Sequence, residues 1–392
     1  MTFDPQAATR AMIDGLGPVA LAKAEAYTTG SHWLMLWGLV VTAVVTAIIV
    51  RLRVFDRIEA RLANRARAVR EFAVFVTFFV LSALLFLPWS IYSEWWRDRS
   101  YGRTSQPFAD YFGQGATAMV ISALVGALFF VGVYALIRRT GSRWWLWSGG
   151  LAAALLAVFL LLSPTLIEPL FNKYQPVPEG PVKAALTAQA QRAGIPAERI
   201  FLFDGSRQSN NFTANVSGLG PAARIAISDV AMNQASLDEV QAVTGHEIGH
   251  YVLGHLWWFV GIGTVLVMAF FFLADRLFAP FARLFGTDAK LADARGIPVL
   301  VFIVSLLTTF AQPLINLVVR SNESAADRYS LETVNLPDAL ATSLVKTAEY
   351  RNPRPGAVEE ALFYTHPSVE RRVLRAMEWK AAHPATGTAP QP

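Results

Sequence analysis

The stretch His246-Glu247-Ile248-Gly249-His250 combines residue types that can do chemistry at a spacing that suits a metal. If the stretch is helical, the two histidines lie one turn apart on one face, where both imidazoles can bind one Zn²⁺. Glu247 then lies beside the metal as a general base. A chain of this length carries the pattern by chance on the order of one time in a hundred, so the surroundings must support it.

The residues before this motif favour a helix. Ser236 and Glu239 have the spacing of a capping box, with serine at the N-cap and glutamate three residues later. Apolar Leu237, Val240 and Val243 then recur at helical spacing. We therefore predict a capped helix that carries both histidines.

A catalytic zinc site needs a third protein ligand and an open position for water. The chain has no cysteine, so this ligand must be His, Asp or Glu. Glu323 is the candidate, and Asp327 shares its face of any helix there. Glu323 can bind the metal while Asp327 accepts the other ring N–H of a ligand histidine. Without the first motif, both would be read as solvated surface carboxylates.

Two further histidines have weaker signals. His366 heads a predicted helix with Val369, Val373 and Met377 on one side, and a histidine or arginine here can hold the oxyanion of a tetrahedral intermediate. The alternative is a surface histidine before a helix. We expect His255, near the membrane surface, to be structural or interfacial.

The composition predicts a polytopic membrane protein. The chain is 54% hydrophobic and 16% charged, whereas soluble domains carry about a quarter charged residues. The sequence pI is about 9.5, but the arginine clusters flank apolar runs. We therefore expect a lipid bilayer as partner and no nucleic acid. Six apolar runs approach or reach spanning length: 33–50, 72–92, 117–137, 144–162, 257–273 and 297–319.

Polar residues interrupt the last of these runs. Gln312, Pro313 and Asn316 would be costly facing lipid. They indicate either a protein or water-filled interior, or a kink packed against neighbouring helices. Both interpretations stay open.

We predict a mainly α protein, with about six transmembrane helices and a soluble, α-rich zincin domain that contains a small β-hairpin or sheet. Residues 200–203 read as a buried strand, and 212–218 and 224–228 flank a Gly-Pro turn as a hairpin. The predicted parts are a membrane domain with four transmembrane helices (1–163), the first part of a protease domain (164–256), two further transmembrane helices (257–319), the C-terminal part of the protease domain (320–380) and a disordered tail (381–392).

Taken in order, these motifs resemble the type I CAAX prenyl protease family, which are membrane-embedded zinc metalloproteases of the gluzincin kind. The resemblance rests on His246-Glu247-x-x-His250, on Glu323 and Asp327 after two apolar runs, and on His366-Pro367. Arg372 follows His366 by six residues. Residues 168–174 and 204–209 are also similar to family segments, and the resemblance extends over residues 25–380.

The resemblance implies one zinc ion per chain, bound by His246, His250 and Glu323, with Glu247 as general base. Asp327 would support a ligand, and His366 and Arg372 would assist the transition state. The implied fold is a ring of tilted helices around a large water-filled chamber. Family members cleave the C-terminal tripeptide from prenylated CAAX proteins, and some also cut upstream.

A peptide substrate would add as a strand to the 212–218 edge, with contacts at Phe212, Ala214 and Gly218. Two departures leave the substrate open. The chain has six apolar runs where eukaryotic members have seven, and it carries Asn211 and Thr213 where the family often has His and Asn. The composition looks bacterial, and bacteria generally do not prenylate CAAX proteins. We expect a multi-pass protein of a bacterial inner membrane, acting on prenylated or other membrane-associated polypeptides.

The sequence and the resemblance disagree on which side of the membrane the active site faces. The loops 51–70, 138–143 and 276–295 fall on one side of the membrane and all are basic. If that side is cytoplasmic, the protease domain is external. The resemblance implies the opposite, a cytoplasmic site.

Other functions are alternatives to this interpretation. An intramembrane protease of the site-2 kind would place the motif inside a spanning helix and use an L-D-G aspartate, which this sequence lacks. A membrane-protein quality-control protease is an alternative. So is a chaperone or translocon-associated scaffold with a structural zinc, although an intact general base and an open coordination position argue against it.

Overall fold

The computed structural model describes residues 3–384, most of which are helical. The predicted tail 381–392 lies outside the described residues from position 385 on, and its first two positions still belong to the last helix. The helices are α1 (Pro5–Asp14), α2 (Gly17–Leu52), α3 (Val54–Arg61), α4 (Arg67–Ser90), α5 (Arg97–Ser100), α6 (Phe108–Thr140), α7 (Trp144–Leu162), α8 (Pro181–Arg192), α9 (Asp229–Gln234), α10 (Leu237–Val252), α11 (His255–Phe285), α12 (Ile297–Thr333), α13 (Pro337–Lys346), α14 (Ala357–Phe363) and α15 (Val369–Ala382).

Within the described residues, five helical segments are long and apolar enough to cross a membrane. They are Gly17–Leu52, Arg67–Ser100, Phe108–Leu170, His255–Phe285 and Ala294–Thr333. The third contains two of the six predicted apolar runs, because only the 3₁₀ turn Gly141–Arg143 separates α6 from α7. Each predicted run therefore lies on a long apolar helix, as expected.

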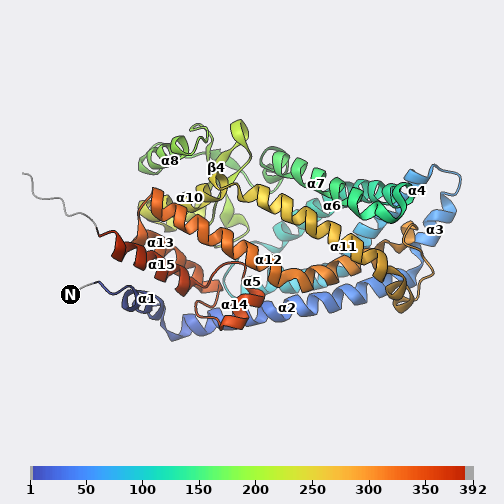
Figure 1. Ribbon diagram of the computed structural model, residues 1–392, viewed down its shortest axis with the longest axis horizontal. Coiled ribbons are helices and arrows are strands. Elements are labelled where there is room, and N and C mark those ends of the chain that lie inside the picture. Colours follow the sequence, from blue (N-terminus) through green and yellow to red (C-terminus); the bar gives the residue numbers. More distant parts are fainter. Residues whose placement is uncertain (1–2, 385–392) are drawn as a thin grey trace, which may run out of the picture.

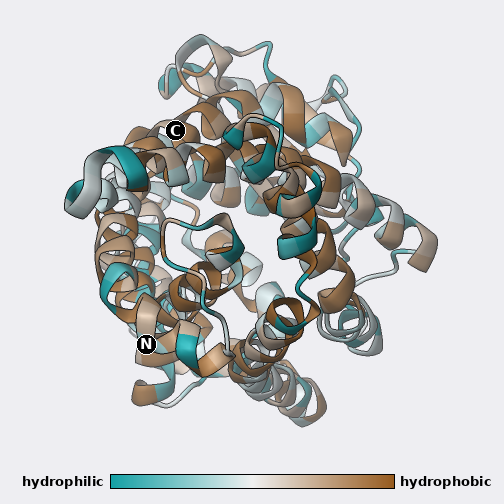
Figure 2. Cartoon of the chain, turned by 90° about the vertical axis from the view of Figure 1, so that its right-hand side faces the viewer, coloured by the Kyte–Doolittle hydropathy of each residue, from teal (hydrophilic) through white to brown (hydrophobic). Residues whose placement is uncertain are grey.

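The long helices run side by side along the long axis of the molecule (Figure 1). Helices α8, α10, α13 and α15 gather with the sheet at one end, and α3 lies at the other (Figure 1). Figure 2 looks along this axis and shows mostly hydrophobic helices arranged as a ring. The packing of α4 on α6 and of α7 on α11 builds a core with Phe75, Tyr134 and Trp144 inside. The water-filled chamber stays a prediction of the resemblance.

A small sheet lies at the end of the molecule where α8, α10, α13 and α15 gather, and its strand order is β1-β2-β4-β3. Its strands are β1 (Tyr174–Pro176), β2 (Ile200–Phe203), β3 (Ala214–Ser217) and β4 (Arg224–Ser228). β2 and β4 are parallel, and the other two pairs are antiparallel. The predicted β3–β4 hairpin is confirmed, but Phe212 and Gly218 lie just outside β3. Among the described residues β3 has a strand neighbour on one edge only, and helix α10 packs against β3.

Two helices position the candidate site. Helix α10 begins with the predicted capping box, in which the Glu239 N–H donates to Ser236 Oγ at 3.2 Å and the Ser236 N–H donates to Glu239 at 2.8 Å. Helix α12 has 37 residues and passes the predicted boundary at 319/320 without a break.

The polar residues that interrupt the sixth apolar run face protein. The side chain of Gln312 donates to Asn316 Oδ1, and the buried Asn316 amide donates to the Leu362 carbonyl oxygen, both at 2.8 Å. Pro313 lies between them within α12. This contact with α14 excludes lipid exposure of Asn316 and fits both interpretations, a protein interior and a kink packed against a neighbouring helix.

Candidate metal centre

The structure brings His246, His250 and Glu323 together, although Glu323 follows His250 by 73 positions in the chain. One ligand atom from each residue lies within 4.8 Å of the others. His246 Nε2 is 3.1 Å from His250 Nε2 and 3.3 Å from Glu323 Oε2. His250 Nε2 is 3.5 Å from Glu323 Oε1. Two imidazole nitrogens and one carboxylate thus converge on a single point.

Small residues allow α10 and α12 to approach so closely. A Cβ on Gly249 would lie 3.1 Å from Tyr329 Cβ and 3.2 Å from Ala326 Cα. A Cβ on Gly245 would lie only 2.5 Å from a methyl group of Val334. The two glycines of the motif helix therefore set the distance between the histidines and Glu323.

Asp327 lies one turn after Glu323 and connects two other site residues. Its Oδ1 is 2.9 Å from His246 Nδ1, the ring nitrogen that faces away from the convergence point. The Arg372 guanidinium donates to both Asp327 oxygens, at 2.7 and 2.6 Å, and its Nη2 lies 3.6 Å from Glu323 Oε2. All these side chains are buried. Arg372 therefore faces the two carboxylates.

His366 also reaches the site, from the turn before α15. Its Nε2 is 3.3 Å from Glu323 Oε1, and its Nδ1 is 2.9 Å from the Thr365 hydroxyl. Burial, aided by the charge of Arg351, lowers the pKa of His366 to about 3. The ring is thus neutral near pH 7. If the Thr365 hydroxyl donates to Nδ1, the ring proton sits on Nε2 and points toward the convergence point.

Glu247 is half-buried on the helix that carries both histidines. Burial raises the pKa of the Glu247 carboxyl above its usual value, against the opposing effect of the neighbouring histidines. Such a shift brings a carboxylate nearer to the pKa range in which general bases work at neutral pH.

The site fits a zinc ion. Glu323 Oε2 is buried and has no hydrogen-bond partner among the residues that the structure describes. This carboxylate oxygen can therefore bind a metal ion. Two histidines and one carboxylate form a donor set found in catalytic zinc sites.

His255 joins the site as a residue that sequence reasoning missed. Its Nδ1 lies 2.8 Å from Nδ1 of His250. Gly254, at φ +67°, lies between the end of α10 and the start of α11, which begins at His255. Because His255 belongs to the next helix, helical spacing from the motif gave no signal for it.

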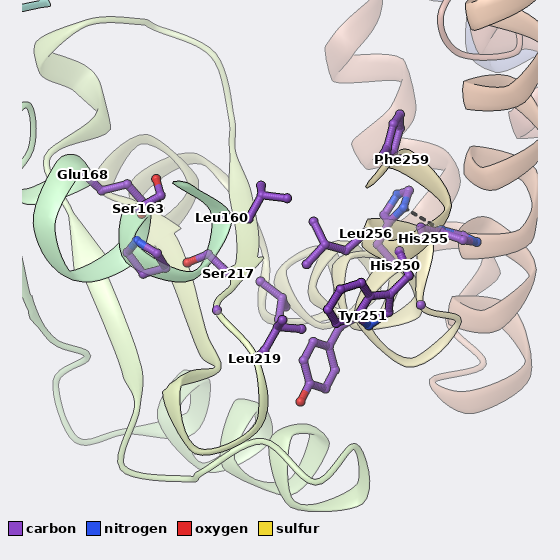
Figure 3. A pocket seen from close by; sticks show the side chains of 15 residues that line it. Leu160, Ser163, Glu168, Ser217, Leu219, His250, Tyr251, His255, Leu256 and Phe259 are labelled. Carbon is purple, nitrogen blue, oxygen red and sulfur yellow. Dashed lines mark hydrogen bonds between the residues drawn. The ribbon is translucent and has the colours of Figure 1, made fainter. Parts of the chain in front are cut away.

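A cavity of about 290 Å³ opens beside His250 and His255 (Figure 3). Leu160 and Leu219 line it from one side and Leu256 and Phe259 from the other, so it is mostly apolar (Figure 3). The residues from the end of β3 to Leu219 form part of the wall. The cavity therefore joins the free strand edge to a candidate metal ligand.

Comparisons with known proteins agree with this geometry. The family described as "Peptidase family M48" matches residues 176–380, and the one described as "CAAX prenyl protease N-terminal, five membrane helices" matches residues 9–173. The "Uncharacterized metalloprotease YhfN" of Bacillus subtilis is 26% identical over 372 residues, which are 92% of this chain and 86% of that protein. "CAAX prenyl protease 1" of Saccharomyces cerevisiae is 26% identical over 321 residues, which are 76% of this chain and 70% of that protein.

A solved structure shows the same fold. The crystal structure of S. mikatae Ste24p matches with a TM-score of 0.75 and 20% sequence identity, over 94% of this chain and 93% of that one. The five candidate membrane spans agree with the membrane-helix family that matches the N-terminal part. Because the M48 match covers more than half of the chain, this multi-pass membrane protein belongs to peptidase family M48 and is a metalloprotease of the CAAX prenyl protease type.

Proposed function

We propose that this protein is a zinc-dependent endopeptidase that hydrolyses peptide bonds near the C-terminus of prenylated or other membrane-associated polypeptides. The observation that carries the proposal is the convergence of His246, His250 and Glu323 within 4.8 Å. These three residues would hold one zinc ion per chain. The names of relatives such as "CAAX prenyl protease 1" support the substrate class.

Glu247 would serve as the base. A zinc ion at this site supplies a Lewis acid that polarises the scissile carbonyl and lowers the pKa of water. Glu247 takes the proton of the attacking water and passes it to the leaving amine. Its raised pKa suits both steps, since the carboxyl must accept a proton and then release it.

The other residues would orient the ligands and the transition state. With the Thr365 hydroxyl donating to Nδ1, neutral His366 would carry its proton on Nε2 and donate a hydrogen bond to the oxyanion that forms beside Glu323. Asp327 holds His246 in the orientation that leaves Nε2 free for the metal. Arg372 acts through Asp327, because its guanidinium is bonded to that carboxylate.

The substrate would bind as an added strand. Among the described residues β3 has no strand neighbour on one edge, and β3 lies against α10, so a peptide can pair with main-chain groups near Ala214, between the flanking Phe212 and Gly218. One apolar side chain of the peptide then enters the cavity beside His250. At about 290 Å³ the cavity lies below the roughly 300–1,000 Å³ of sites that hold a drug-sized ligand, so it suits a side chain rather than a whole lipid tail.

The test is to measure zinc content and peptide cleavage in one detergent-purified batch, wild type beside Glu247→Gln. We expect one zinc in both proteins and a loss of cleavage of about 10²–10⁴-fold in the variant. Asp238→Asn, an exposed change on the same helix, is the control and should cleave normally. Normal turnover of Glu247→Gln would remove the base assignment, and absence of zinc from wild type would remove the proposal.

The substrate class needs a second comparison. A farnesylated CAAX peptide and its unprenylated twin separate a lipid requirement from recognition of the peptide alone. Leu219→Trp, which fills the cavity, should lower kcat/KM for peptides with a large apolar side chain by about tenfold relative to alanine peptides. Leu284→Trp, a highly exposed change outside the site, is the matched control. An unchanged preference in Leu219→Trp would leave the cavity without a role in specificity.

A further inference from the structure

Arg351 lies in the segment between α13 and α14, and the chain fixes this segment beside the turn that carries His366. The carbonyl oxygens of the two residues after Arg351 accept hydrogen bonds, both at 3.2 Å, from the Tyr364 hydroxyl and from the Glu370 N–H. These two donors lie on either side of His366 in the sequence. Arg351 is therefore held next to a residue of the candidate metal centre.

The guanidinium of Arg351 lies close enough to the metal centre to act on it. Its charge lowers the pKa of His366 more strongly than the Glu323 carboxylate raises it, although Glu323 Oε1 is only 3.3 Å from His366 Nε2. Electrostatic interactions weaken with distance, so the guanidinium lies near this ring. Burial and the charge of Arg372 lower the pKa of Arg351 itself, but a guanidinium stays charged at neutral pH.

This charge has no counter-ion in the part of the chain that the structure describes. Arg351 is half-buried, and its guanidinium forms no hydrogen bond or ion pair with any described residue. Two neighbouring arginines differ, because Arg372 is bonded to Asp327 and Arg320 donates to two carbonyl oxygens. A cation that is partly removed from water and left unpaired costs free energy. An anion that reaches Arg351 is therefore stabilised there.

A peptide substrate offers such an anion at its end. Guanidinium groups bind carboxylates through two parallel hydrogen bonds, and a polypeptide ends in a free carboxylate. The cavity described above borders the metal centre through His250, and Arg351 borders it beside His366. The Nε2 atoms of these two histidines lie 3.5 and 3.3 Å from Glu323 Oε1. One peptide that crosses the metal centre can thus contact both the cavity and Arg351.

We propose that Arg351 binds the free C-terminal carboxylate of the substrate and so places the hydrolysed bond only a few residues from the end of the polypeptide. This inference rests on the proposed function, since it needs a peptide at the metal centre. It supplies a physical reason for a preference for bonds near the C-terminus. A bond in the middle of a long chain leaves Arg351 without an anion and is cut more slowly.

The test compares three peptides that differ in the C-terminal group. They are the farnesylated CAAX peptide as its free acid, the same peptide as a C-terminal amide, and an amide whose last residue is glutamate. We expect wild type to cleave the acid with a kcat/KM roughly 10–100-fold above that of either amide, the effect of a hydrogen bond between charged groups.

Each other result has a distinct meaning. Equal cleavage of the acid and the amide overturns the proposal but leaves the proposed function standing. Cleavage of the glutamate amide as fast as the acid overturns it too, because Arg351 would then bind a side-chain carboxylate. Cleavage of none of the three peptides contradicts the proposed function, on which the inference rests.

Variants then connect the preference to Arg351. Arg351→Gln should cleave the acid no faster than the amide, with the amide rate and the zinc content near those of wild type. Arg351→Met is a second neutral variant, in case glutamine prevents folding, and should show the same loss. Arg351→Lys keeps the charge without the paired donors and should retain part of the preference.

The matched control is Arg371→Gln, which changes an arginine that is more than half exposed and lies 3.4 Å from Glu360. It should keep the full preference for the acid. A general loss of packing would slow the acid and the amide alike, so the ratio of the two rates isolates the contact with the carboxylate. A wild-type ratio in a folded neutral variant of Arg351 overturns the proposal.

Discussion

His255 Nδ1 lies 2.8 Å from His250 Nδ1, so an imidazole holds one candidate zinc ligand while the Asp327 carboxylate, 2.9 Å from His246 Nδ1, holds the other. In this pair His250 must donate and His255 must accept if His250 Nε2 is to keep a lone pair for the metal. His255→Ala removes the acceptor. We expect zinc affinity to fall about 10–100-fold, as measured by competition with a chelator.

The control for this change is His383→Ala, a histidine that stacks on Trp379 at the end of α15, away from the site. It should hold zinc as tightly as wild type. If His255→Ala also binds zinc with unchanged affinity, the contact between the two rings has no part in orienting His250.

The bond between Arg372 and Asp327 predicts a large loss of stability. Arg372→Ala leaves the buried Asp327 carboxylate without its cation, which costs about 3–5 kcal/mol in the free energy of unfolding. Thermal or denaturant unfolding in detergent measures this loss. The neighbouring Arg371 is more than half exposed and lies 3.4 Å from Glu360, so Arg371→Ala should cost no more than about 1 kcal/mol. Equal losses in the two variants would contradict the assignment.

Because α10 and α12 approach so closely, we expect a single methyl group added at Gly249 to weaken zinc binding. Gly249→Ala places a Cβ 3.1–3.2 Å from Tyr329 and Ala326, so α10 must shift away from α12. The histidines then move from Glu323, and we expect weaker zinc binding with little change in unfolding. Gly261→Ala in α11, where a new Cβ meets nothing within 4 Å, should leave zinc content unchanged. Full zinc occupancy in Gly249→Ala at limiting zinc would show that the packing tolerates the methyl group.

The start of the motif helix predicts a pH dependence of stability. Burial raises the pKa of Glu239, but hydrogen bonds from Lys346 Nζ at 2.7 Å and the Ser236 N–H at 2.8 Å outweigh it and hold the pKa below its usual value. The stabilisation is therefore complete above the unfolded-state pKa of about 4.3 and disappears as the pH falls through the lower folded-state pKa.

Glu239→Gln keeps the cap but loses the charge pair with Lys346. Because Lys346 is partly exposed, we expect a loss of at most about 1 kcal/mol at pH 7, shrinking toward zero below pH of about 4. Unfolding in detergent at several pH values measures it. The exposed neighbour Asp238→Asn should show no such trend. A loss of stability in Glu239→Gln that persists in acid would mean that the shape of the side chain, and not its charge, matters at this position.

The elements that local pattern specifies were predictable from the sequence. The Ser236 capping box, the apolar runs and the β3–β4 hairpin all follow from residues near one another in the chain, and the structure confirms each. Helical spacing placed His246 and His250 on one face of one helix. The count of membrane segments differs because the turn between α6 and α7 is too short to separate two candidates.

Contacts between distant segments were harder to predict. The pairing of His250 with Glu323 came from a resemblance, because no local rule joins α10 to α12. The parallel pair β2–β4 and the packing of α1 on α15 had no sequence signal at all. The place of His255 in the site was not predicted, because Gly254 breaks the helix just before His255. The roles of the site residues remain proposals that the experiments above address.

Helix α12 gives the metal centre a property that a soluble protease lacks. Its 37 residues extend about 55 Å at 1.5 Å per residue, well beyond a hydrocarbon core of about 30 Å. One end of this rod therefore rests in lipid while the other carries Glu323 to the histidines of α10. A bilayer too thin or too thick for the embedded half is accommodated by tilt. If α12 tilts relative to α10, Glu323 moves against His246 and His250, so we expect zinc binding at the proposed site to depend on the thickness of the surrounding bilayer.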